Sequence, residues 1–143
     1  MEVRAILSTH SCLAFAQDLL PSEREASVHG LIGGAPLAVF NNGSAGMPNF
    51  AGERCGLMTR VSADEDVPAD SIYGVQVGPL RIDAVPVLYD HEAWWHTFRK
   101  AWPVDSAAAL SYADRIDRGP NYTRAMAMRL TGSGCRDGRR PMA

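Results

Sequence analysis

Cysteine is scarce in this chain of 143 residues, and its three cysteines, Cys12, Cys55 and Cys135, lie far apart. Their odd number and wide spacing do not predict a disulfide framework, and no close pair has the spacing of a zinc knuckle or a redox motif. A reducing cytoplasm is therefore the expected compartment.

Long apolar runs are also missing. None approaches the roughly 18 residues that a membrane span needs, and the first residues lack the basic and apolar regions of a signal peptide. The net charge is only −2, which gives no electrostatic case for a nucleic-acid or membrane partner. With 46% hydrophobic and 21% charged residues, we expect one folded domain over residues 1–130 and a flexible tail over residues 131–143.

Two apolar segments end in short polar turns. Residues 6–12 are Ile-Leu-Ser-Thr-His-Ser-Cys, and residues 39–48 are Val-Phe-Asn-Asn-Gly-Ser-Ala-Gly-Met-Pro. Each apolar part predicts a buried strand, and α/β proteins place their chemistry at the ends of such strands. These two turns are therefore the best indication of function.

In this order, the two turns resemble the C-terminal half of calcineurin-like metallophosphoesterases. The likeness continues more loosely to about Pro120. It implies an α/β fold, with a partial sheet and C-terminal helices packed on it, and two-metal hydrolysis of a phosphomonoester or phosphodiester substrate. Two positions depart from the family pattern: Asn42 replaces a common Pro, and Cys12 stands in the place of a second His.

The resemblance assigns His10 and Cys12 to a metal-binding turn, with Mn, Fe or Zn as the metal if other ligands complete the site. A thiolate at position 12 suits zinc better than Mn or Mg, and an inert packed thiol is the alternative. The family's Asp-x-His, Gly-Asp-x-x-Asp and Gly-Asn-His-(Asp/Glu) segments do not occur in the sequence. We therefore expect a truncated or split form, whose remaining ligands would lie upstream of Met1.

The turn formed by Asn41, Asn42, Gly43 and Ser44 has two interpretations. Its donors and conformationally free backbone suit the binding of a phosphate group. Asn and Gly also supply positive φ angles in a plain tight turn after a strand. It is not a Walker loop, because no Gly-Lys-Ser/Thr ending follows. The sequence leaves both interpretations open.

The predicted function is thus a metallophosphoesterase-like protein without the N-terminal metal-ligand motifs. The alternative is a non-catalytic interaction module or a dimer-forming α/β protein, because a half-domain is expected to expose apolar sheet surface. Such a surface would pair with a second copy or with a complementary N-terminal half. A further alternative is an unrelated enzyme with Cys12 as nucleophile and His10 as base, although the sequence identifies no orienting group.

The remaining pattern predicts strands near residues 3–7, 37–40, 57–61, 72–77 and 80–89, the last two joined by a turn at the edge of a sheet. Residues 12–20 predict a short helix or a packed loop. A helix capped by Asp90 is expected to begin at His91 and to stop before Pro103. A second helix capped by Ser106 should stop at Gly119-Pro120, and a third should run from Tyr122 to Leu130. A solvated acidic loop is expected to contain Asp64, Glu65, Asp66 and Asp70. An aromatic group in the core or at an interface is expected to contain Trp94, Trp95, Phe98 and Trp102.

Overall fold

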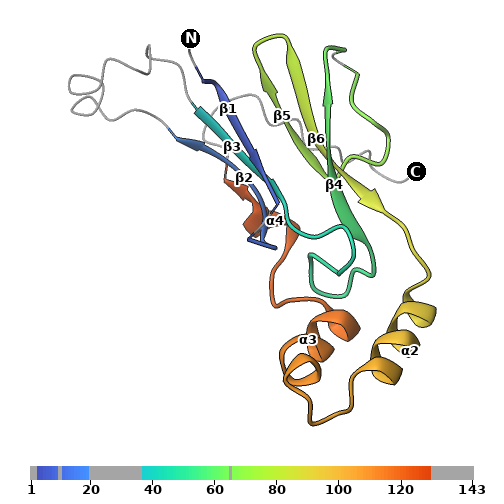
Figure 1. The fold of residues 1–143 in the computed structure, drawn as a ribbon. Coiled ribbons are helices and arrows are strands. Elements are labelled where there is room, and N and C mark those ends of the chain that lie inside the picture. The colour runs from blue at the N-terminus through green and yellow to red at the C-terminus, as the bar shows by residue number, and fades with distance from the viewer. Residues whose placement is uncertain (1–2, 10, 20–36, 65, 130–143) are drawn as a thin grey trace.

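Two β-sheets and three helices form the mixed α/β fold of the residues that the computed structural model describes, which are 3–9, 11–19, 37–64 and 66–129 (Figure 1). The first sheet has the order β1-β3-β2-β7 and the second has the order β4-β6-β5. Their strands are β1 (Ala5–Ser8), β2 (Ala14–Leu19), β3 (Leu37–Asn42), β4 (Gly56–Ser62), β5 (Tyr73–Val77), β6 (Leu80–Val87) and β7 (Met128–Arg129). The predicted α/β class is confirmed, whereas the expected tail over residues 131–143 lies outside the described residues.

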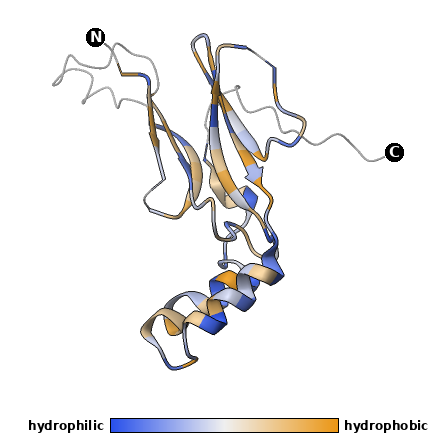
Figure 2. Ribbon diagram, turned by 45° about the vertical axis from the view of Figure 1, so that its right-hand side comes forward, coloured by the Kyte–Doolittle hydropathy of each residue, from blue (hydrophilic) through white to orange (hydrophobic). Residues whose placement is uncertain are grey.

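The core lies between the two sheets. Phe40 of β3, Leu57 of β4 and Ile82 of β6 are fully buried in one apolar cluster. The rings of Phe40 and Tyr73 join the sheets, with their centroids 5.2 Å apart. Figure 2 shows hydrophilic and hydrophobic residues alternating along the strands, as expected where each sheet buries one face.

Most of the described part of the segment 12–20 is a strand, and the expected short helix or packed loop is wrong there. Residues 14–19 form β2, which pairs antiparallel with β3 and parallel with β7. Ala14 and Ala16 both face the core, because they are two residues apart, which is the period of a strand. The spacing of the apolar residues in this segment fits the period of a helix as well as that of a strand, so the pairing with β3 decides its structure.

The predicted hairpin of β5 and β6 is confirmed, but β6 is the central strand of its sheet and not an edge. Pro86 is nevertheless tolerated there. The pairing with β5 ends at Tyr73 and Ala84, so Pro86 has a strand neighbour only in β4, where it lies opposite Leu57. Its missing N–H therefore breaks no bond to β5.

Two of the predicted helices are confirmed with their caps. Helix α2 (His91–Ala101) begins after Asp90, whose carboxylate accepts from the backbone N–H of Ala93. Helix α3 (Ala107–Arg118) begins after Ser106, whose hydroxyl accepts from Ala109. Both N-caps satisfy backbone donors that a helix start leaves unpaired.

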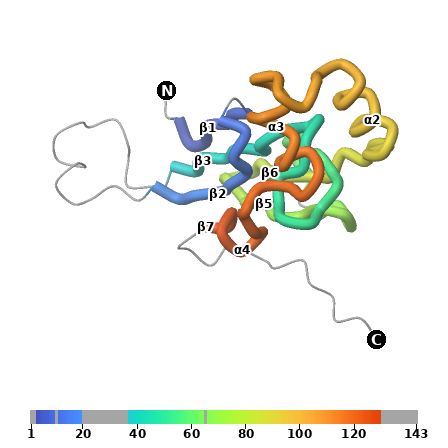
Figure 3. The backbone as a smooth tube through the Cα atoms, turned by 90° about the horizontal axis from the view of Figure 1, so that it is seen from below, coloured from blue at the N-terminus to red at the C-terminus, as the bar shows by residue number. Residues whose placement is uncertain are grey.

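We expected the C-terminal helices to pack on a sheet, and this prediction is wrong for α2 and α3. Helices α2 and α3 lie side by side and project from one end of the two-sheet body (Figures 1 and 3). The third helix, α4, covers only Arg124–Ala127 and lies against β2. It ends early because Met128 pairs with Ala16 of β2 and starts β7.

Candidate functional site at the strand ends

The two predicted turns meet at one edge of the first sheet. Asn41 donates from Nδ2 to the hydroxyls of Ser8, at 2.8 Å, and Ser11, at 2.9 Å. The hydroxyl of Thr9 donates to the carbonyl of Gly43 at 3.0 Å. His10 itself lies outside the described residues. Its sequence neighbours Thr9 and Ser11 both contact the second turn.

The register of two parallel strands explains this meeting. β1 and β3 pair in parallel, with Ser8 directly beside Asn41, so both strands end at the same edge. Polar residues that follow parallel strands are brought together in this way. The sequence predicted each strand end, but not that the two strands are neighbours.

Backbone donors in the second turn are used within the protein. The N–H of Gly43 donates to the side-chain oxygen of Asn41 at 2.7 Å, and the N–H of Ser44 donates to that of Asn49 at 2.8 Å. Gly43 has a φ of 73°, the left-handed conformation that glycine adopts easily. A phosphate-binding nest needs free N–H groups, and these two are occupied.

The side chain of Asn42 is also occupied, by the second sheet. Its Nδ2 donates to the carbonyl of Leu57 at 2.8 Å, and its oxygen accepts from the hydroxyl of Thr59 at 3.3 Å. The hydroxyl of Tyr73 donates to the backbone carbonyl of Asn41 at 2.9 Å, and burial raises the pKa of Tyr73 above its usual range. The geometry therefore favours the tight-turn interpretation, while phosphate contact by this turn stays a prediction.

Asn49 is a buried member of this site that sequence reasoning missed. It holds Ser44 through two hydrogen bonds and also donates to the carbonyl of Met47 at 3.2 Å. The only signal for it was an Asn directly after Pro48, close to a glycine-rich turn.

Cys12 occupies a distinct backbone position in the first turn. Its φ is 52°, which is uncommon for a residue other than glycine. Its N–H donates to the carbonyl of Thr9 at 3.3 Å, and its own carbonyl accepts from the guanidinium of Arg115 in α3. The thiol group belongs to a half-buried residue without a disulfide.

Arg115 brings a positive charge to this turn from the far end of the sequence. Its Nη2 donates to Cys12, while its Nε is buried and has no hydrogen-bond partner among the described residues. A fixed guanidinium attracts an anionic group and repels a metal cation. Nothing in the sequence pattern connected residue 115 with residue 12.

The described residues do not fit a metal centre by themselves. Within the described ranges, no group of three or more His, Cys, Asp or Glu side chains is placed to hold a metal ion. Of the two predicted ligands, Cys12 lies beside a guanidinium and His10 is outside those ranges. A metal at this edge would need ligands beyond the residues that the structure describes.

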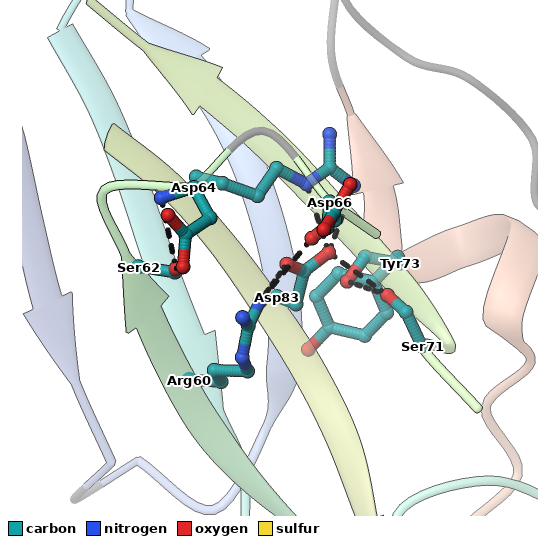
Figure 4. Close-up of polar contacts among 8 residues, drawn as sticks. Arg60, Ser62, Asp64, Asp66, Ser71, Tyr73 and Asp83 are labelled. Carbon is teal, nitrogen blue, oxygen red and sulfur yellow. Dashed lines mark hydrogen bonds and ion pairs between the residues drawn. The ribbon is translucent and has the colours of Figure 1, made fainter. Parts of the chain in front are cut away.

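A second charged cluster, on the second sheet, is held together by contacts among its own residues (Figure 4). Arg81 donates to Asp83 Oδ1 from Nε at 2.9 Å and from Nη2 at 2.8 Å, and Ser71 donates to the same oxygen at 3.0 Å. Arg60 Nη1 lies 3.6 Å from the other carboxylate oxygen. Asp64, Asp66 and Asp70 nearby are exposed, as predicted for a solvated loop. We assign this cluster a structural role.

Cys55 is a poor candidate for a reactive thiol. Burial raises its pKa, and the neighbouring Glu53 carboxylate raises it further, while Arg124 lowers it. A thiol with a raised pKa stays protonated at neutral pH, and the protonated form is neither a strong nucleophile nor a metal ligand.

Comparisons with protein-family models, curated proteins and solved structures find no match to this chain. None of the helices in the described part of the chain is both long enough and apolar enough to cross a membrane.

Proposed function

We propose that this chain is a metallophosphoesterase-like protein, in which the turn of His10 and Cys12 belongs to a phosphoester-binding site at the strand ends. One observation carries the proposal. The residues on either side of His10 both hydrogen-bond to the Asn41–Gly43 turn, Thr9 to Gly43 and Ser11 to Asn41. The two turns on which the resemblance depends therefore lie next to each other, which supports the proposal.

Arg115 supports the same substrate class. A phosphoester is anionic, and the guanidinium of Arg115 is held at the Cys12 turn by a hydrogen bond to the backbone. Charge-assisted bonds from arginine to phosphate oxygens are among the stronger polar contacts in proteins. We assign Arg115 to binding of the phosphate group, and the Asn41 turn to positioning of the residues around it.

Hydrolysis by the described residues alone is not part of the proposal. A divalent metal such as Mn, Fe or Zn would supply Lewis-acid chemistry in this class of enzyme. Because the described residues form no metal centre, its further ligands would come from residues outside the described ranges or from a complementary N-terminal half.

Zinc titration of the purified chain tests the proposal that the turn of His10 and Cys12 binds a metal. We expect weak binding that falls at least about tenfold in His10→Ala, because loss of a ligand weakens a metal site strongly. His96→Ala is the matched control, because this exposed histidine lies in α2. Equal zinc affinity in the wild type and His10→Ala would overturn the assignment.

A chromogenic phosphodiester assay with added Mn tests whether the metal site of the chain is complete. We expect turnover near background for the chain alone. Strong turnover that depends on His10 would show that the site is complete and would contradict the need for outside ligands.

Inorganic phosphate tests the role of Arg115. We expect Arg115→Lys to weaken phosphate binding by about tenfold, because lysine keeps the charge and loses the planar donor pair. Arg99→Lys, on the projecting α2 helix, is the control and should bind phosphate like the wild type.

A further inference from the structure

An apolar groove runs between α2 and α3, away from the strand-end site. Its volume is about 460 Å³. Phe98 and Ala109 are buried there, and exposed apolar side chains form much of the rim. The groove is lined by Trp95, Phe98, Arg99, Trp102, Pro103, Val104, Ala109, Leu110, Ala113 and Asp114.

The two helices beside the groove contact each other near the sheets, and residues 102–106 connect them at their other ends. Near the sheets, Nε2 of His91 lies 2.7 Å from the carbonyl of Ile116 and donates to it. Farther along α2, Trp95 stacks on Phe98 with centroids 5.8 Å apart. Trp95 and Phe98 thus line the groove on the α2 side.

The rim leaves much apolar area in water. Trp102 is 49% exposed, Val104 is 75% exposed and Leu110 is 77% exposed. Burial of one such side chain contributes about 1.5–3 kcal/mol, so an uncovered group of three is unfavourable. A small ligand on the groove floor would leave the projecting side chains in water. A protein surface would cover them.

Two opposite charges on the rim indicate which protein surface fits. Arg99 lines the groove from α2 and Asp114 lines it from α3. Among the described residues, neither is joined to a partner by an ion pair. When two identical surfaces meet about a two-fold axis, every contact between the copies occurs twice. Arg99 of each copy can therefore face Asp114 of the other copy.

We propose that the groove is a homodimer interface, in which the α2–α3 pair of one copy packs on that of a second copy as four helices. The helix pair projects from one end of the body, so the two bodies would lie away from each other (Figure 1). The net charge of −2 opposes association only weakly. This inference does not depend on the phosphoester proposal.

The size of the interface predicts a weak dimer. Helices of 11 and 12 residues are each about 17 Å long, and two of them side by side are about 20 Å wide. That face gives about 700 Å² for both copies, below the roughly 1,200 Å² of most stable interfaces. We expect a concentration-dependent dimer with a Kd in the micromolar range or weaker.

Sedimentation equilibrium from about 1 µM to about 1 mM tests the proposal. We expect the mass to double with concentration in the wild type, and Leu110→Asp to weaken the dimer at least about tenfold. Leu88→Asp is the matched control, because Leu88 is 83% exposed and does not line the groove. A monomeric wild type, or equal effects of the two substitutions, would overturn the proposal.

A charge exchange provides an independent test if Leu110→Asp fails to fold. Arg99→Glu and Asp114→Arg should each weaken the dimer, because each places like charges opposite each other. The double variant carrying both changes restores opposite charges and should recover the wild-type Kd. A double variant that is as weak as either single variant would refute the proposed pairing.

Discussion

Asn49 holds the backbone of Ser44 by two reciprocal hydrogen bonds. Its side-chain oxygen accepts from the N–H of Ser44 at 2.8 Å, and its Nδ2 donates to the carbonyl of the same residue at 2.7 Å. Asn49 thus satisfies both polar groups of Ser44, as a neighbouring strand would. The turn that follows β3 is fixed by this side chain and not by its own residues alone.

Asn49→Ala should therefore destabilise the protein. It leaves the half-buried N–H of Ser44 without a partner, while the carbonyl of Ser44 keeps the N–H of Leu57 at 2.8 Å, and we expect a loss of about 1–3 kcal/mol in the free energy of unfolding. Urea unfolding followed by circular dichroism measures the loss. Asn121→Ala is the control, because this asparagine is exposed, and it should change stability by less than about 0.5 kcal/mol. Similar losses in the two variants would contradict the structural role of Asn49.

Two tyrosines should respond differently to loss of their hydroxyls. Tyr73 donates to the carbonyl of Asn41, so Tyr73→Phe should cost about 1–2 kcal/mol. The hydroxyl of Tyr89 is buried without a hydrogen-bond partner among the described residues, so Tyr89→Phe should be neutral or stabilising. Chemical denaturation of both variants measures the two changes in the free energy of unfolding. A larger loss in Tyr89→Phe would show that the hydroxyl assignments are wrong.

Alkaline pH should destabilise the protein partly through Tyr73. Burial raises the pKa of Tyr73 in the folded state above its ordinary value of 10.0. As the pH rises above 10.0, Tyr73 loses its phenolic proton in the unfolded state but keeps it in the folded state. The folded state then binds more protons than the unfolded state, so the stability falls as the pH rises. By pH 11, the wild type should lose about 1.4 kcal/mol more than Tyr73→Phe does. Parallel pH profiles for the two proteins would exclude this linkage.

The buried carboxylate of Asp83 should be essential only while Arg81 remains. Asp83→Ala leaves the buried guanidinium uncompensated, and we expect a loss of about 3–5 kcal/mol. Replacement of both residues, Arg81→Met with Asp83→Leu, should recover most of that loss. Exposed Asp64→Ala is the control. Thermal or urea unfolding of the three variants measures the coupling, and a double variant no better than Asp83→Ala would contradict it.

Local signals in the sequence predicted much of the structure. Asp90 and Ser106 cap the two long helices, and Gly119 ends the second of them with a φ of 75°. The turn at Gly78 joins the two strands expected on either side of it. These features depend on residues close in sequence, so their patterns carry the information.

Features that depend on distant residues were missed or misjudged. Residues 14–19 became a strand because β3 lies beside them, and the third helix was cut short by pairing of Met128 with β2. Asn49 and Arg115 joined the candidate site through contacts that no local pattern indicates.

By itself, the sequence determined the helix caps, the hairpin and the two polar strand ends, because each results from short-range preferences of the backbone. Only the tertiary structure decided that the strand ends adjoin, that their amides are occupied, and that the aromatic helix pair stands apart with an open groove. Those outcomes depend on strand register and side-chain packing between segments far apart in the chain, which local preferences do not specify.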